Sequence, residues 1–104
     1  MRDYKIYILE IIENLADIKE FVKDMNFESF YEDKKTQNAV IRSFEVIGEA
    51  AKNIPKEIYE QYPDVPWKTL AGFRDRLIHA YFDVNLDIVW SAVQQVDSLL
   101  QKLQ

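Results

Sequence analysis

Cysteine is absent from this sequence, and glycine, proline and histidine are scarce, with two, three and one copies among 104 residues. The absence of cysteine excludes disulfides and thiolate metal sites. With a single histidine a zinc site of the usual kind is not expected either, and we predict no metal ion and no cofactor. So few helix-breaking residues argue against a turn-rich β fold and favour long helices.

Long apolar runs and a basic charge balance are also missing. No stretch reaches the roughly 18 apolar residues of a membrane-spanning helix, and the charged first residues are not typical of a signal peptide. We therefore expect a cytoplasmic protein. The 18 acidic residues outnumber the 13 basic ones, which gives a net charge of −5. Because nucleic-acid binders are usually basic, any contact with RNA must come from a local basic patch.

Apolar residues recur in alternating steps of four and three at the start of the chain. This spacing predicts a helix over residues 3–25, with Asp3 as its N-cap. Ser29 and Glu32 match a capping box, which predicts that a short helical turn opens at Ser29.

Four further helices complete the predicted fold. They are expected over 34–53, over 55–62, from 66 to 81 or 82, and from a cap at Asn85 to 103. Gly48 lies on the apolar face of its helix, where glycine costs helix stability, so we expect a neighbouring helix to approach closely there. The chain as a whole is predicted to be one all-α domain over 1–104, an antiparallel bundle of four or five helices with short connections.

One segment, 72–82, gathers the side chains best suited to catalysis: Arg74, Asp75, Arg76, His79 and Tyr81. Metal-free RNA cleavage needs a base for the ribose 2′-OH, an acid for the leaving 5′ oxygen and a cation for the phosphate. His79 can do either proton transfer near neutral pH, and Arg74 can bind phosphate oxygens. Asp75 lies one helical turn before His79 and is expected to orient its ring, and Arg76 is a possible supporting cation.

Helical geometry separates two of these residues. At about 100° per residue, Arg74 and Tyr81 lie about 20° apart on one stripe, whereas His79 lies about 140° round the helix from Arg74. A second copy of the helix across a two-fold axis would supply two arginines and two histidines, so that one histidine acts as base and the other as acid.

A structural interpretation competes with the catalytic one. Arginine and histidine five positions apart are common by chance, and a lone histidine in an apolar helix is usually a hydrogen-bonded structural residue. On that interpretation Arg76 belongs to a solvated face. Trp67, Trp90 and Phe73 are then core residues rather than platforms for stacking bases.

Several stretches together carry a resemblance to a known family. Arg74-x4-His79-x-Tyr81 resembles the signature of HepT-like HEPN domains, and 36–42, 46–55, 65–67 and 77–84 resemble the family's other stretches in the same order. The resemblance implies an all-α HEPN-like homodimer with its active site in the dimer cleft. It also implies metal-independent endoribonuclease activity, with Arg74 and His79 as catalytic residues acting on RNA.

The same resemblance implies a biological role. The protein would be the toxin of a type VII-like toxin–antitoxin pair, and a minimal nucleotidyltransferase antitoxin of the MntA type would silence it by transferring AMP to Tyr81. The sequence departs from the family at Asp75, where many HEPN domains carry Asn. An acid beside Arg74 opposes phosphate binding.

Two other functions remain open from the sequence. The acidic charge favours a non-catalytic HEPN module that binds a nucleotidyltransferase partner or a nucleotide. A helical bundle without a site is the third interpretation, and it leaves the clustered Arg74, His79 and Tyr81 unexplained.

Overall fold

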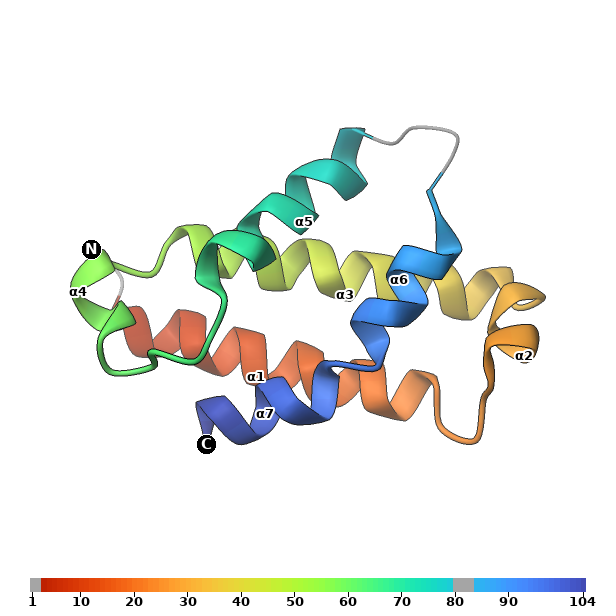
Figure 1. Cartoon of the computed structure of the whole chain (residues 1–104), viewed down its shortest axis with the longest axis horizontal. Helices are drawn as coiled ribbons and strands as arrows, with labels where there is room; N and C mark the ends of the chain where they lie inside the picture. Colours follow the sequence, from red (N-terminus) through yellow and green to blue (C-terminus); the bar gives the residue numbers. More distant parts are fainter. Residues whose placement is uncertain (1–2, 80–83) are drawn as a thin grey trace.

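The computed structural model describes residues 3–79 and 84–104, which fold into helices joined by turns and contain no strand (Figure 1). The elements in chain order are α1 (Tyr4–Phe21), α2 (Phe27–Tyr31), α3 (Lys34–Lys52), α4 (Lys56–Tyr59), α5 (Trp67–His79), α6 (Leu86–Val93) and α7 (Val96–Leu103). The predicted all-α class is confirmed. Asp3 and Asn85 cap α1 and α6 through their side-chain oxygens, as the sequence predicts.

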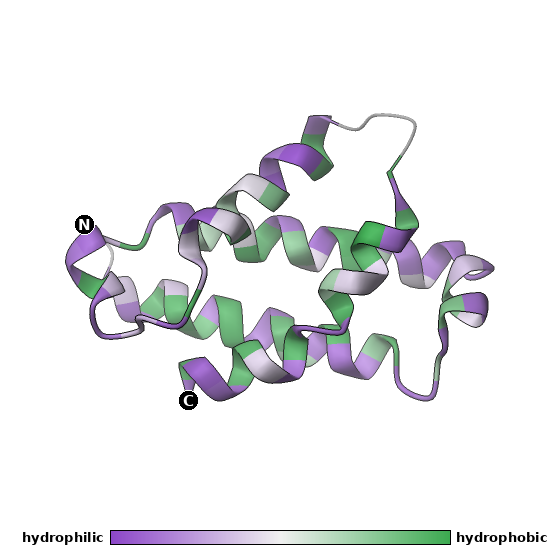
Figure 2. Cartoon of the chain, in the orientation of Figure 1, coloured by the Kyte–Doolittle hydropathy of each residue, from purple (hydrophilic) through white to green (hydrophobic). Residues whose placement is uncertain are grey.

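Helix α3 is the centre of the fold. It packs against α1 on one side and α5 on the other, while α7 lies along α1 and α2 rests on α3 (Figure 1). Hydrophobic and hydrophilic residues alternate turn by turn along these helices, the pattern of helices that bury one face (Figure 2). The apolar seam predicted for α1 is confirmed, because Ile8, Ile11, Leu15 and Ile18 are buried. Within the described ranges no helix is both long and apolar enough to cross a membrane.

Gly48 sets the distance between α3 and α5. A Cβ atom at Gly48 would overlap the Cβ of Arg74 and would lie 2.7 Å from the carbonyl oxygen of Leu70. Only glycine therefore lets the two helix backbones come this close, which confirms the predicted close approach. The glycine also fixes where the Arg74 side chain leaves the helix pair.

The end of α1 and the start of α2 differ from the prediction. Helix α1 stops at Phe21 rather than near residue 25, and Asp24 adopts a φ of 63° in the turn that follows, a conformation that aspartate tolerates better than most residues. The predicted capping box at Ser29 was wrong. Asn26 is the N-cap of α2, and Ser29 is its partner at the third helical position.

The last predicted helix is two helices, because α6 ends at Val93 and α7 begins at Val96. The buried residues Val93, Val96 and Leu99 follow one another in two steps of three. On a straight helix Val93 and Leu99 would lie about 120° apart. The break at Gln94 and Gln95 turns both of them toward the core, and it swings α6 away from the line of α7 (Figure 1).

The two glycines offer a matched test of the α3–α5 contact. Gly48→Ala should lower the free energy of unfolding by about 1–2 kcal/mol, since overpacking outweighs the better helix propensity of alanine. A Cβ at Gly72, on the open side of α5, would meet nothing within 4 Å. Gly72→Ala should therefore stabilise the protein by about 0.5–1 kcal/mol.

Urea unfolding of both variants and the wild type, at one protein concentration, measures the difference. A Gly48→Ala variant as stable as Gly72→Ala would show that the contact is not tight.

Candidate active site

Helix α5 carries the candidate residues on two of its sides. Leu70 and Leu77 are buried against the core, and Arg74 lies between them, one turn from each. Arg74 is thereby held at the α3–α5 seam beside Gly48. His79 closes the last turn of the helix and is exposed.

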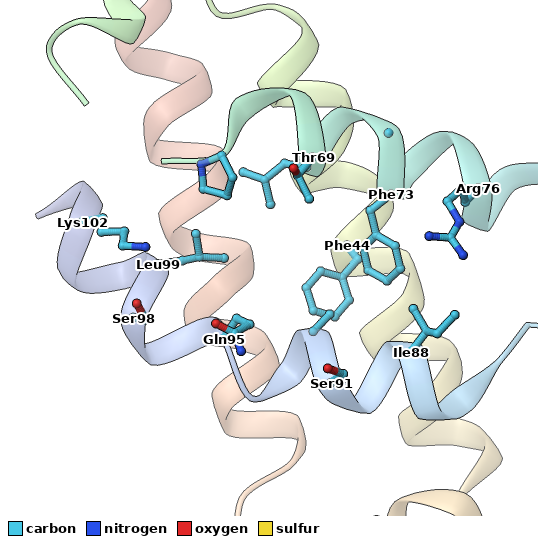
Figure 3. A pocket seen from close by; sticks show the side chains of 14 residues that line it. Phe44, Thr69, Phe73, Arg76, Ile88, Ser91, Gln95, Ser98, Leu99 and Lys102 are labelled. Carbon is cyan, nitrogen blue, oxygen red and sulfur yellow. The ribbon is translucent and has the colours of Figure 1, made fainter. Parts of the chain in front are cut away.

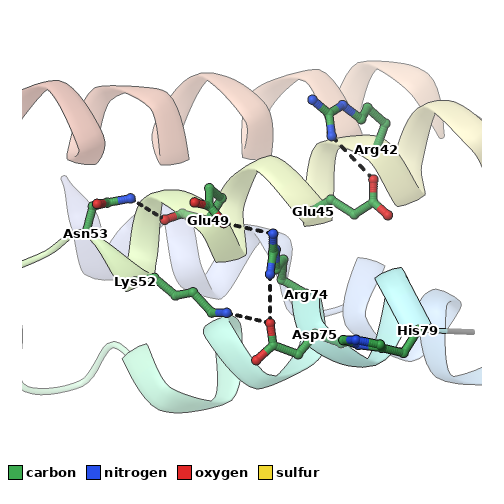
Figure 4. A network of polar contacts seen from close by, with 8 residues as sticks. All are labelled: Arg42, Glu45, Glu49, Lys52, Asn53, Arg74, Asp75 and His79. Atoms are coloured by element: carbon green, nitrogen blue, oxygen red, sulfur yellow. Dashed lines mark hydrogen bonds and ion pairs between the residues drawn. The ribbon is translucent and has the colours of Figure 1, made fainter.

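The Arg74 guanidinium is held by two carboxylates (Figure 4). Its Nη2 lies 3.1 Å from Oε2 of Glu49 on α3, and its Nη1 donates to Oδ1 of Asp75 at 3.0 Å. The Arg74 side chain is 26% exposed, so its stem is packed while the charged end reaches the surface. A fixed and partly desolvated guanidinium of this kind is suited to binding an anion.

Asp75 bridges two cations from different helices. Its Oδ1 accepts a hydrogen bond from Nζ of Lys52 on α3 at 2.6 Å, in addition to the one from Arg74 (Figure 4). The hydrogen bond from Lys52, and secondly the one from Arg74, holds the pKa of the Asp75 carboxyl below its usual value. Asp75 is therefore ionised at neutral pH. With Glu49 it balances the two positive charges of the cluster.

His79 is oriented by the backbone and not by the Asp75 carboxylate as the sequence suggested. Its Nδ1 lies 2.7 Å from the carbonyl oxygen of Asp75. A carbonyl only accepts, so Nδ1 donates and the neutral ring has its acceptor at Nε2. The expectation about the carboxylate was wrong: its Oδ1 accepts from Lys52 and Arg74, and the ring bonds to the carbonyl of the same residue. The His79 ring still has a fixed tautomer, and its Nε2 is available to accept a proton.

The predicted residues are only partly brought together. Within the described part of the chain no hydrogen bond or ion pair joins the side chains of Arg74 and His79, which agrees with their separation round the helix. Arg76 is exposed, as predicted, and points to another side of α5. Tyr81 lies outside the described residues.

Three aromatic residues pack as the structural interpretation predicts. Trp67 is buried and stacks on Tyr59, with ring centroids 5.6 Å apart. Phe73 and Trp90 are partly buried against the core. None of the three is an open platform for a base.

Glu49 and Lys52 were not among the predicted site residues. Glu49 directly follows Gly48 on α3, Lys52 lies four positions beyond Gly48, and each forms an ion pair with a residue of α5. Gly48 could have pointed to these two residues in the sequence. A glycine on the apolar face of a helix indicates the position along α3 at which another helix comes close. Charged residues within a turn of it are placed to meet α5.

A groove of about 660 Å³ lies on another side of α5, between that helix and the pair α6 and α7 (Figure 3). Phe44, Leu70, Phe73 and Leu99 give it an apolar floor, and Arg76 and Ile88 lie at one end. His79 follows Arg76 by three residues and so lies about 60° from it round α5. His79 is therefore close to Arg76 on the helix but is not itself a lining residue of the groove.

Comparison with known proteins identifies the family to which this chain belongs. The model of the HepT-like ribonuclease family matches residues 11–104, which include α3, α5 and the whole Arg74 cluster. The chain belongs to this family. No solved structure matches it. The HepT-like assignment agrees with the resemblance found in the sequence.

Individual relatives support the HepT-like assignment over nearly the whole chain. A candidate RNase of Methanocaldococcus jannaschii is 52% identical over 88% of this chain and 76% of its own length. A candidate HepT ribonuclease of Thermococcus cleftensis is 45% identical over 99% and 94%. A candidate RNase of Caldanaerobacter subterraneus is 42% identical over 98% of both chains.

Proposed function

We propose that this HepT-like protein is an endoribonuclease that cleaves RNA without a metal ion, using Arg74 and His79. The main support is the pair of groups on α5. Arg74 has a guanidinium held in place by ion pairs, and His79, five residues on, has an exposed imidazole whose tautomer is set by the Asp75 carbonyl. These are the cation and the proton-transfer group that the reaction needs. Membership of a ribonuclease family supports the same conclusion.

The proposed step is an internal transfer at phosphorus. A neutral imidazole takes the proton of the ribose 2′-OH, and the 2′ oxygen attacks the phosphorus atom. The bond from phosphorus to the 5′ oxygen breaks, and that oxygen receives a proton from a protonated imidazole. Arg74 stabilises the charge on the non-bridging phosphate oxygens. The products are a 2′,3′-cyclic phosphate and a 5′-hydroxyl.

Two histidines in opposite protonation states are supplied if the protein is a homodimer. We propose that the second copy lies against the α5 helix and its apolar groove, because this surface is large and apolar and is bounded at one end by Arg76, three residues before His79. A two-fold axis beside the last turn of α5 would bring the two helix ends together, so that one cleft could hold two arginines and two histidines. We expect a total buried area above about 1,200 Å².

The dimer should be sensitive to a charge placed in the groove. Wild-type protein should sediment as a dimer at micromolar concentration, and Ile88→Glu should sediment as a monomer, because a carboxylate cannot be buried unpaired in the interface. Leu9→Glu is the control: Leu9 is 57% exposed on α1 and Ile88 is 38% exposed on α6. A wild-type monomer would contradict the dimer and the shared cleft.

Loss of either catalytic side chain should abolish cleavage. Arg74→Ala and His79→Ala should each lower the rate of RNA cleavage by about 100-fold or more while helicity is retained. Arg42→Ala is the control, since Arg42 pairs with Glu45 on α3 and its side chain is 74% exposed. EDTA should not change the rate of RNA cleavage by the wild type.

Expression of the wild type, but not of His79→Ala, should arrest growth and degrade cellular RNA.

Wild-type cleavage by His79→Ala would remove histidine from the mechanism. A large loss of thermal stability in both alanine variants would instead mark the pair as structural.

The biological setting we propose is a type VII-like toxin–antitoxin pair. A minimal nucleotidyltransferase of the MntA type would transfer AMP to Tyr81, two positions beyond His79 in the sequence. The AMP group would occupy the space of the substrate nucleotide, and its phosphodiester charge would compete with RNA for Arg74 or Arg76. Both effects oppose substrate binding without unfolding the domain. This proposal rests on the family resemblance.

Mass spectrometry tests the acceptor. After incubation with ATP and the nucleotidyltransferase, wild-type protein should gain one AMP mass or a multiple of it and lose RNA cleavage, whereas Tyr81→Phe should remain unmodified and active. Tyr31→Phe, at a tyrosine that is 60% exposed, should behave as the wild type. Efficient modification and silencing of Tyr81→Phe would eliminate Tyr81 as the acceptor.

A non-catalytic module remains the second candidate. The net charge of −5 favours it, and so does the occupation of Arg74 by Glu49 and Asp75. Such a module would bind the nucleotidyltransferase or a nucleotide but would not cleave RNA. The cleavage experiment decides, because only the ribonuclease requires growth arrest by the wild type and its loss in His79→Ala.

A further inference from the structure

Two cations from separate helices converge on one oxygen atom. Lys52 Nζ on α3 and Arg74 Nη1 on α5 donate to the same Oδ1 of Asp75, at 2.6 and 3.0 Å (Figure 4). A non-bridging oxygen of an RNA phosphate is also an anionic acceptor, and lysine and arginine bind it with the same charge-assisted geometry. The carboxylate oxygen therefore lies where a phosphate oxygen would be held by both cations.

We propose that Lys52 is a substrate-binding residue that holds an RNA phosphate together with Arg74, at the place that the Asp75 carboxylate fills in the free protein. The inference deepens the proposed ribonuclease function and rests on it. It assigns a contact to α3, a helix that contributes no residue to the catalytic pair.

The surroundings allow this exchange. The side chains of Lys52 and Asp75 are 37% and 45% exposed, so the carboxylate can turn into solvent without disturbing the core. Lys52 is the last residue of α3, where the helix dipole favours a positive charge whether or not Asp75 is paired. A phosphodiester carries one negative charge, as does the carboxylate it displaces from the two cations, so each cation keeps an anionic acceptor.

Glu49 has a separate part in the exchange. It pairs with Nη2 of Arg74 and Asp75 pairs with Nη1, so the two carboxylates use different arms of the guanidinium fork. When a phosphate accepts a hydrogen bond from Nη1, Glu49 can stay paired with Nη2 and hold the guanidinium group in place. Glu49 is thus a positioning residue, while Lys52 and Arg74 contact the substrate. This pair of cations gives an acidic protein a local binding point for a phosphate, although the cluster as a whole has no excess of positive charge.

Binding of a fluorescent oligouridine to the His79→Ala protein tests the proposal, because this background binds RNA without cutting it. Adding Lys52→Met should weaken binding about tenfold, the loss expected for one charged hydrogen bond. The slope of log affinity against log salt, measured between about 50 and 200 mM salt, should fall by about 0.7, the value for one phosphate contact on a single strand. Adding Asp75→Asn instead should tighten binding, because the competing charge is gone.

Lys68→Met in the same background is the matched control. Lys68 is exposed on α5, seven residues before Asp75 and so about two turns along the same stripe. It should leave the salt slope unchanged, because removing it changes the net charge equally without removing the contact. Unchanged affinity and slope in the Lys52→Met protein would overturn the proposal. An equal effect of Lys68→Met would also overturn it, since charge alone would then explain the loss.

The outcome is separate from that of the ribonuclease proposal. Failure of the wild type to cleave RNA would refute catalysis, whereas the binding series reports on Lys52 alone. A Lys52→Met protein that melts well below the control but keeps the wild-type salt slope would assign Lys52 a structural role and contradict the inference.

Discussion

The close approach of α3 and α5 at Gly48 is the constraint on which the candidate site depends. Because no Cβ separates the helices there, the Arg74 side chain starts inside the seam and must leave it along a fixed path. The same approach brings Glu49 and Lys52 within reach of α5. One missing methyl group thus determines which charges surround the guanidinium.

These charges explain how an acidic protein can offer a site for phosphate. The four charged side chains Glu49, Lys52, Arg74 and Asp75 sum to zero, and each cation already has an anionic acceptor. In the exchange that we propose, such a cluster would bind RNA by replacing one acceptor with another and would need no excess of positive charge. Asp75, which looks unfavourable in the sequence, would then be the acceptor that the phosphate replaces. His79 is independent of this network, because the backbone sets its ring.

Sequence patterns predicted the parts of the fold that depend on local periodicity. The buried seam of α1, the bounds of α3 within one residue and the tight contact at Gly48 all followed from the spacing of apolar residues. The break between α6 and α7 did not, because it depends on which neighbours each turn must face. The link from Lys52 to Asp75 spans 23 positions and could not be read from either helix alone.

We propose that this HepT-like protein cleaves RNA by proton transfer and phosphate stabilisation without a metal ion. The chemistry of the new RNA ends tests it most directly. Purified protein is incubated with a defined RNA in excess EDTA, and the termini are identified by mass spectrometry. We expect 2′,3′-cyclic phosphates and 5′-hydroxyls. Products with 3′-hydroxyls and 5′-phosphates, formed only when a divalent ion is added back, would contradict it.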